Sequence, residues 1–127
     1  MMDLTPKLAD GAKVVQGYAE GRFRIGGEIF PHSVLVMPGV VEAWQVADLA
    51  TASVESLEPV LAAGRAGAVE VLIIGCGPRT QLVPRPLREA LKAAGIGVEG
   101  MDTGAAARTY NVMTMEDRKA AAALIVL

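Results

Sequence analysis

The sequence predicts a single α/β domain with a mixed central sheet, helices on that sheet, and a small antiparallel β unit from the N-terminal third. Three observations lead to this fold class. Apolar and polar residues alternate between short glycine turns over residues 12–46, the pattern of half-buried strands. Val69–Gly75 is an almost continuous apolar run, which is typical of a strand buried on both faces. Residues 69–102 follow a strand–helix–strand order, which implies parallel pairing and a right-handed connection.

The N-terminal third is predicted to form short strands joined by tight turns. Residues 1–12 have no clear period and are expected to be a loose lead-in, so the domain proper covers residues 13–127. Turns are predicted at Glu20-Gly21, at the hairpin dipeptide Gly26-Gly27 and at Pro38-Gly39. The positions that define the strands are Val14, Val15, Tyr18, Phe23, Ile25, Ile29, Phe30 and Ser33–Met37.

The second half carries helix signals around the apolar run. We expect Ser56 to cap a first helix, with Glu58 and Pro59 in its first turn. A second helix opens at Pro84 and Pro86, and Gly95 is placed to end it.

The last segments alternate between strand and helix. Residues 97–102 form the second strand of the crossover, and Asp102 or Thr103 then caps a helix that runs to about Met115. The tail, residues 120–127, is predicted to be a strand because it ends in a β-branched and apolar run.

Composition narrows the classes of function. The chain has 127 residues, 52% of them hydrophobic, and a net charge of −2 without a strongly basic stretch, which argues against a nucleic-acid partner. One cysteine, Cys76, cannot form an internal disulfide, so we expect a cytoplasmic location. We also expect no integral membrane segment, because the longest apolar run, residues 120–127, is too short to cross a bilayer. A homo-oligomer stays open.

The loop Gly75-Cys76-Gly77-Pro78-Arg79-Thr80 is the sharpest local motif. A glycine-rich loop after a buried strand can bind phosphate through backbone N–H groups, and Asp102 ends the next strand, where an acid would contact a ribose. The fingerprint is incomplete, because Thr80 stands at the third glycine position and Pro78 lacks an N–H. The preferred interpretation is a turn that needs glycine, and no cofactor is predicted.

Cys76 and His32 are the other chemically suggestive residues. A thiol nucleophile needs a nearby base, and no pattern brings His32, the only histidine, to Cys76. One histidine and one cysteine do not make a structural zinc site, so no metal is predicted.

A dense polar segment follows the second parallel strand, where open α/β sheets bind ligands. Two interpretations stay open: a binding cleft, or a buried polar network that fixes a helix on the sheet. Glu116 is a candidate ion-pair partner for Arg108. The candidate ligand or partner cleft comprises Gly75, Cys76, Gly77, Arg79, Met101, Asp102, Thr103, Arg108, Thr109, Tyr110 and Asn111.

Trp44 is the only tryptophan in a chain with few aromatic residues. A core position is the ordinary interpretation, and an interface anchor is the alternative, because tryptophan is enriched in interface hot spots.

Several stretches together resemble one family, the small domain family that includes mitochondrial NADH:ubiquinone oxidoreductase complex assembly factor 3. The likeness covers residues 14–127, and its most specific parts are Met-Asp-Thr and Arg-Thr-Tyr-Asn in this order and spacing. The stretches are Ser33–Val36 with Trp44, Leu72–Gly77, Val98–Thr103, Ala106–Asn111, Glu116–Arg118 and Ala121–Leu124.

The resemblance implies a three-layer fold and a role exerted through protein contacts, since the mitochondrial member helps to build respiratory complex I. It supplies no established catalytic residues. This chain has Cys76 where many relatives have threonine, which argues against an obligatory thiol.

Three functions remain in competition. The preferred one is a non-catalytic accessory factor acting through protein–protein contacts, with respiratory-complex subunits as partners by analogy. The second is a small-molecule or anion-binding module in which Arg79 and Arg108 bind the ligand. The third, an enzyme, lacks a recognisable mechanism, because only Glu99, Asp102, Glu116 or His32 could serve as a base.

Overall fold

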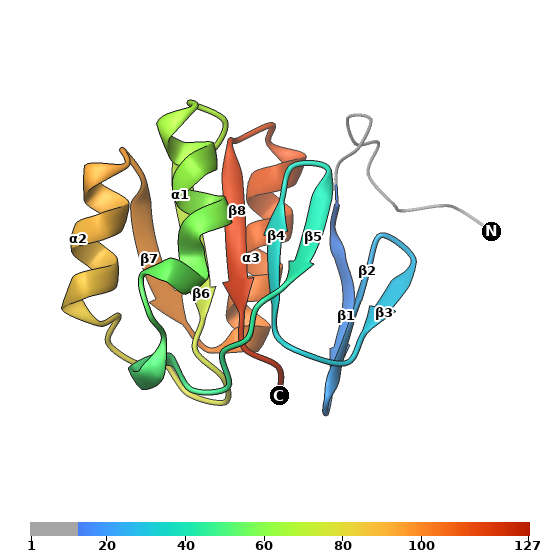
Figure 1. The fold of residues 1–127 in the computed structure, drawn as a ribbon. Coiled ribbons are helices and arrows are strands. Elements are labelled where there is room, and N and C mark those ends of the chain that lie inside the picture. The colour runs from blue at the N-terminus through green and yellow to red at the C-terminus, as the bar shows by residue number, and fades with distance from the viewer. Residues whose placement is uncertain (1–12) are drawn as a thin grey trace.

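The computed structural model describes residues 13–127, so the predicted lead-in of residues 1–12 lies outside the described residues. Within these residues, two sheets and three α-helices form three layers (Figure 1). In chain order the elements are β1 (Val15–Ala19), β2 (Arg22–Ile25), β3 (Glu28–Phe30), β4 (Val34–Met37), β5 (Val40–Ala43), the 3₁₀ turns η1 (Leu49–Thr51) and η2 (Glu55–Leu57), α1 (Glu58–Arg65), β6 (Val71–Gly75), α2 (Arg85–Ala93), β7 (Gly97–Met101), α3 (Thr103–Met115) and β8 (Ala120–Leu124).

The central sheet has five strands in the order β5-β4-β8-β6-β7. β6 pairs in parallel with both β7 and β8, while β4 pairs antiparallel with β5 and β8. The predicted mixed sheet, the parallel crossover and the strand at the tail are therefore confirmed.

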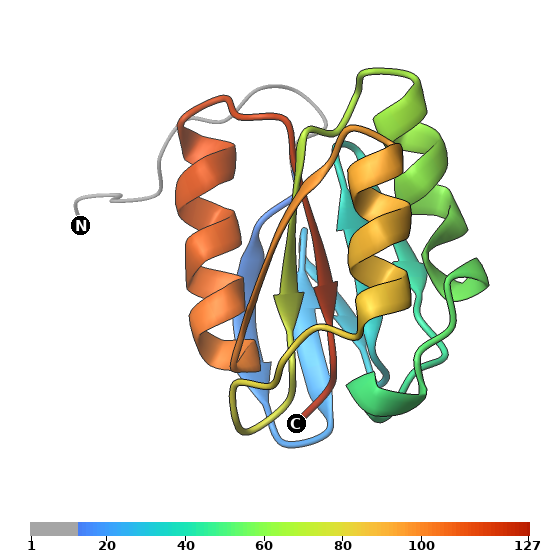
Figure 2. The same ribbon diagram turned by 90° about the vertical axis from the view of Figure 1, so that its left-hand side faces the viewer.

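The two faces of the central sheet carry different layers. Helices α1 and α2 cover one face, and α3 covers the other together with the three-stranded sheet β1-β2-β3 (Figure 2). Successive side chains of β6 point to opposite faces of the sheet, so the core has two parts. Leu72 and Ile74 pack toward α1 and α2, and Ile73 packs toward α3. Strand β8 is built almost wholly of buried alanines, which lets the layers on both faces approach closely.

The N-terminal third is divided between the two sheets. We predicted one antiparallel unit over residues 12–46, whereas the small sheet ends at Phe30 and β4–β5 form a hairpin within the central sheet. The physical reason is burial: every residue of β4 is buried, and such a strand needs layers on both of its faces.

Helix ends follow the predicted signals with one exception. Asp102 caps α3 by accepting a hydrogen bond from the Ala105 N–H (2.9 Å), and Gly95 follows α2 with φ of 77°. The predicted cap at Ser56 is wrong. A 3₁₀ turn precedes α1, so Leu57 takes the cap position and the Ser56 hydroxyl donates to the Ser53 carbonyl instead (2.7 Å).

Among residues 13–127, no helix combines the length and apolar character that crossing a membrane requires.

Candidate functional site

Thr103, the first residue of α3, joins the loop that follows β6 to the chain tail. Its buried hydroxyl accepts a hydrogen bond from the Gly77 N–H (2.9 Å) and donates to the Ile125 carbonyl (2.7 Å). The Thr103 N–H donates to the Gly77 carbonyl (2.8 Å), so loop and helix are joined by both backbone and side chain. A Cβ on Gly75 would lie 3.0 Å from Thr103 Cα. The glycine loop therefore packs against the α3 start and the chain tail.

Cys76 is buried within this loop. Its Sγ lies 3.8 Å from the Ile74 carbonyl oxygen and 3.7 Å from that of Gln81, and its own carbonyl accepts from Gln81 Nε2 (3.2 Å). His32 lies beside Phe30 and Ser33 before β4, with Nδ1 2.9 Å from the Ser33 carbonyl oxygen. The structure shows no contact between the thiol and this imidazole in the described part of the chain.

The Arg-Thr-Tyr-Asn segment lies further along α3 and contacts neighbouring elements. Asn111 Nδ2 donates to the Val15 carbonyl and Asn111 Oδ1 accepts from the Val15 N–H, both at 2.8 Å. Arg108 Nη1 donates to the Tyr18 hydroxyl, and the Thr109 hydroxyl lies 3.3 Å from Met101 Sδ on β7. Arg108 and Asn111 thus attach the small sheet to α3.

Tyr110 lies between these residues and points into the core. Burial raises the pKa of its hydroxyl above the ordinary 10.0, and a hydrogen bond with Thr114 opposes this effect. The neutral phenol is therefore the form that the fold stabilises.

The structure divides the predicted cleft residues between two places. Gly75, Gly77 and Thr103 meet at the end of β6, whereas Arg108 and Asn111 face the small sheet. Asp102 uses its carboxylate as the α3 cap, and Arg79 is exposed on the loop. Between residues 13 and 127, no ion pair joins Arg108 to Glu116.

Trp44 is only 2% exposed and belongs to the core under α1 and α2. Its Nε1 donates to the Ser56 hydroxyl (3.0 Å), so Ser56 holds this buried indole in place. The structure gives Trp44 a core position, and its side chain presents almost no surface in this conformation.

Sequence reasoning did not select Val15, Tyr18 or Ser33 as polar partners. Ser33 Oγ accepts from the Val126 N–H (2.9 Å), which fixes the chain tail beside β4. Ser33 is separated from its partner by 93 residues and Val15 from its partner by 96, so no local spacing signals these contacts.

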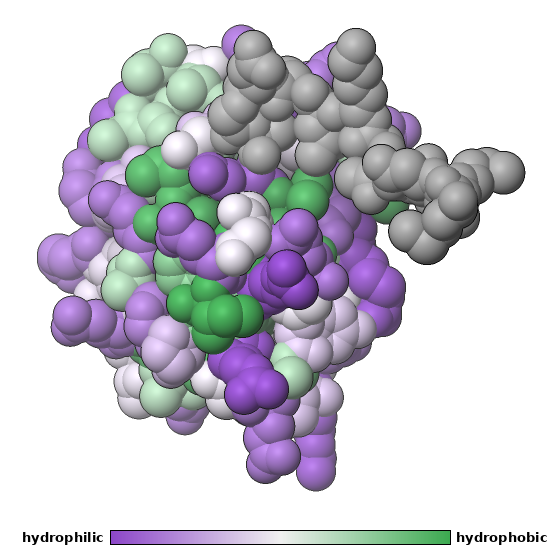
Figure 3. Space-filling view, turned by 90° about the vertical axis from the view of Figure 1, so that its right-hand side faces the viewer, coloured by the Kyte–Doolittle hydropathy of each residue, from purple (hydrophilic) through white to green (hydrophobic). Residues whose placement is uncertain are grey.

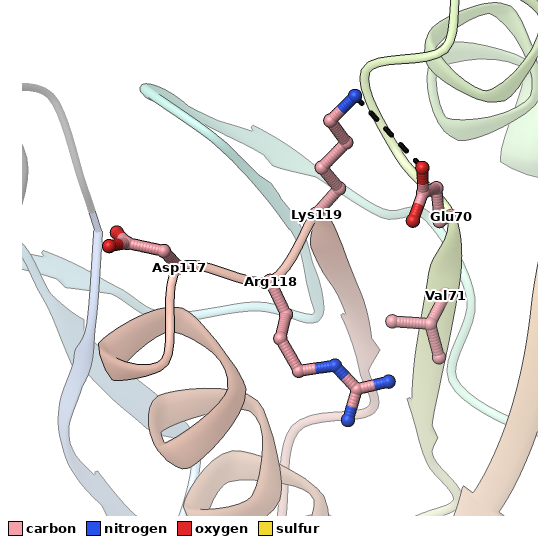
Figure 4. Close-up of a pocket in the computed structure, with 5 residues that line it drawn as sticks. All are labelled: Glu70, Val71, Asp117, Arg118 and Lys119. Atoms are coloured by element: carbon pink, nitrogen blue, oxygen red, sulfur yellow. Dashed lines mark ion pairs between the residues drawn. The ribbon is translucent and has the colours of Figure 1, made fainter.

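A charged hollow of about 370 Å³ lies at the opposite end of the sheet, between β6 and the turn into β8 (Figure 4). Lys119 Nζ lies 4.0 Å from a Glu70 carboxylate oxygen, Arg118 extends toward Val71, and Asp117 points away from it. Two acids and two cations balance one another here, so the hollow favours neither an anion nor a cation. No group of three His, Cys, Asp or Glu side chains suited to a metal ion occurs in the described residues.

The surface over the small sheet is mixed in character. Figure 3 shows hydrophobic residues separated by hydrophilic ones on this side. Ile29 on β3 is among the exposed large hydrophobic residues, at 57%.

Comparison with known proteins places these features in a family. Residues 15–125 match the family described as protein of unknown function (DUF498/DUF598). The chain is 36% identical to NADH dehydrogenase (ubiquinone) 1 alpha subcomplex assembly factor 3 of Danio rerio, over 98% of this chain and 70% of that protein. It is 34% identical to an uncharacterised protein of Rhodobacter capsulatus, over 91% of this chain and 86% of the relative.

Solved structures share the architecture. A crystal structure described as an outer membrane protein from Bartonella henselae superposes with a TM-score of 0.84 at 31% identity. That match covers 91% of this chain and 96% of the other. That protein therefore shares the fold of this chain.

Proposed function

Since the chain belongs to the family of proteins of unknown function DUF498/DUF598, we propose that it is a non-catalytic accessory protein that acts through protein–protein contacts in the assembly of a respiratory membrane complex. One observation carries the proposal: the likeness to a complex I assembly factor extends over nearly the whole chain. We also propose a cytoplasmic location, which is in keeping with a single, buried and unpaired cysteine.

The contacts of the predicted site residues support this function over a ligand-binding one. Thr103, Asp102 and Asn111 use their polar groups on neighbouring backbone atoms. Side chains committed in this way are not available to bind a substrate, and their contacts stabilise the scaffold on which a partner surface would lie. Arg79 and Arg108 remain the residues through which an anion would bind in the alternative function.

A crosslinked pull-down from cells that express the protein tests the proposal. We expect enrichment of respiratory-complex subunits with the wild type, measured by quantitative mass spectrometry against an unrelated bait. Arg108→Ala removes a guanidinium beside Tyr18, and Arg85→Ala is the matched control, because Arg85 is exposed on α2 and within residues 13–127 it pairs with Glu89 alone. Loss of enrichment in the first variant alone would place the contact face near α3. Absence of any respiratory subunit with the wild type would refute the proposal.

A thermal-shift screen with nucleotides, phosphates and carboxylates tests the alternative function, an anion-binding module. A ligand present at a hundred times its Kd raises stability by about 2.7 kcal/mol, which a melting curve detects readily. A reproducible shift that Arg79→Ala abolishes would favour the anion-binding module instead.

A further inference from the structure

Strand β7 forms one edge of the central sheet and is open to solvent. Figure 2 shows it at the near edge, between α2 and α3. The Gly97 N–H donates to the Glu70 carbonyl (2.9 Å), and the Met101 carbonyl accepts from the Cys76 N–H (2.8 Å), so the odd-numbered residues of β7 bond toward β6. Backbone groups alternate in direction along a strand, so those of Val98 and Gly100 point outward. These outward groups have no hydrogen-bond partner within residues 13–127.

A hollow adjoins this open edge on the α2 face of the sheet, and a second hollow lies along α3 on the other face. On the α2 side, a hollow of about 330 Å³ lies over Val98 and Gly100 and is bordered by Leu82, Val83 and Arg88. Leu82 is 82% exposed, the highest value among the large hydrophobic residues described. A Cβ on Gly100 would lie 3.0 Å from Val83, so the loop that precedes α2 already occupies the space next to Gly100 on this face. If another strand paired with β7, an apolar side chain of that strand beside Val98 would lie in this hollow and cover the exposed Leu82.

The hollow on the α3 side is lined by residues of α3 and of the turn that follows it. It has a volume of about 350 Å³, and one of its lining residues is Thr109, whose hydroxyl contacts Met101 of β7. Glu116 and Arg118 line it as well. Glu99 lies on the α3 face of β7, because it pairs in register with Ile73, which packs toward α3. Its side chain is exposed.

The position of Glu99 selects between possible occupants of the edge. In the antiparallel register that pairs all five residues of β7 with a second copy, the two Glu99 side chains lie opposite each other. Like charges at opposed positions destabilise a strand pair, so this fully paired dimer is disfavoured. A basic residue of a different chain at that position would form a favourable pair instead.

We propose that β7 is a docking edge for an extended segment of a partner protein, which adds a sixth strand to the central sheet. The segment carries a basic residue opposite Glu99 and apolar residues on either side of it that pack toward Val98 and Leu82. Hydrogen bonds to Val98 and Gly100 supply affinity, and the alternating side chains supply specificity. The inference rests on the proposed function in one respect only, that the partner is a protein.

A short palindromic peptide probes the edge directly. Acetyl-Thr-Val-Lys-Val-Thr-amide presents the same side chains in either strand direction, with lysine opposite Glu99 and valines on the other face. We expect saturable shifts of the Val98 and Gly100 amide resonances, together with slower hydrogen exchange at both, in titrations of the labelled protein.

Charge reversal supplies the decisive comparison. Glu99→Lys should weaken binding of the lysine peptide by about threefold, the size of a cross-strand charge pair, and should strengthen binding of Thr-Val-Glu-Val-Thr. Glu42→Lys is the matched control, because Glu42 is an exposed carboxylate on β5, the opposite edge of the same sheet. It should leave both affinities unchanged.

Three results would overturn the proposal: no saturable shift at millimolar peptide, shifts centred on β5, or peptide preferences that ignore the charge at position 99. A dimer detected by sedimentation, with slowed hydrogen exchange at Val98 and Gly100 in the dimer, would equally refute the proposal, in favour of self-pairing. If the peptide test failed and the pull-down succeeded, β7 would be excluded as the docking edge, and the proposed function would still be supported.

Discussion

The carboxamide of Asn111 forms two hydrogen bonds with the backbone of Val15, each 2.8 Å long. One amide on α3 thus supplies to β1 the donor and acceptor that a neighbouring strand would supply. Val15 is the first residue of the small sheet and is buried against α3. The pair therefore fixes where the three-stranded layer begins.

Asn111→Ala should destabilise the protein, because it leaves the Val15 N–H and carbonyl without partners. An unsatisfied buried polar group costs about 1–3 kcal/mol, and we expect a loss of that size in the free energy of unfolding from urea titration. Hydrogen exchange at the Val15 amide should accelerate as well. Asn111→Asp keeps an acceptor for the N–H and should lie between wild type and alanine. Equal stability of all three proteins would contradict this role.

Thr103→Val replaces a buried hydroxyl with a methyl group of similar shape. The Gly77 N–H and the Ile125 carbonyl each lose a partner, so we expect a loss of about 1–3 kcal/mol in the free energy of unfolding. Trp44 is the only tryptophan, and its fluorescence reports the transition. Thr103→Ser retains the hydroxyl and should recover most of the difference. If serine were no better than valine, packing rather than hydrogen bonding would explain the need for Thr103.

Much of the fold could be read from periodicity and turn residues. The buried run at β6, the helix stop at Gly95 and the Asp102 cap are local signals, and each predicted an element that the structure contains. The partner of each strand is not a local property. The β4–β5 hairpin could have joined either sheet, and its place depends on contacts with β8, nearly ninety residues further along the chain.

The candidate site illustrates the same limit more sharply. The sequence singled out Arg108 and Asn111 by their polarity but left open whether they bind a ligand or hold the fold. Their contacts lie with Tyr18 and Val15, at sequence separations of 90 and 96. Spacing along a chain carries no information about such pairs, so only the folded arrangement reveals them.

Gly75 should resist substitution because it lies against the backbone of α3. A Cβ there would lie 3.0 Å from Thr103 Cα and from Leu124 Cδ2, and a backbone atom cannot move aside easily. Overpacking of this kind costs about 1–3 kcal/mol, so we expect Gly75→Ala to lower the free energy of unfolding by that amount.

Gly97→Ala is the matched control for Gly75→Ala on the neighbouring parallel strand. Its nearest contact is the Glu70 carbonyl oxygen at 3.8 Å, an ordinary distance. Alanine also restricts the unfolded chain, which stabilises proteins by about 0.4–1 kcal/mol where the native backbone allows it. Chemical denaturation gives the free energy of unfolding of both variants. If Gly75→Ala were as stable as the wild type, α3 would be able to shift away from β6.

The buried Tyr110 predicts how stability changes in alkali. Burial raises the pKa of its hydroxyl in the folded protein above the ordinary 10.0, so the unfolded chain releases this proton first as the pH rises. Above about pH 10 the unfolded state then binds fewer protons than the folded state, and stability falls with pH. Below that pH the contribution of the neutral phenol is fully present.

Urea titrations at a series of pH values from 8 to 11 check this expectation, with Tyr110→Phe beside the wild type. The phenylalanine variant has no proton to release there, so its stability should decline less steeply above about pH 10. Tyr18→Phe is the control, because Tyr18 is 39% exposed and Tyr110 remains in place. Parallel curves for the wild type and Tyr110→Phe would mean that the buried phenol ionises as easily in the folded protein as in the unfolded chain.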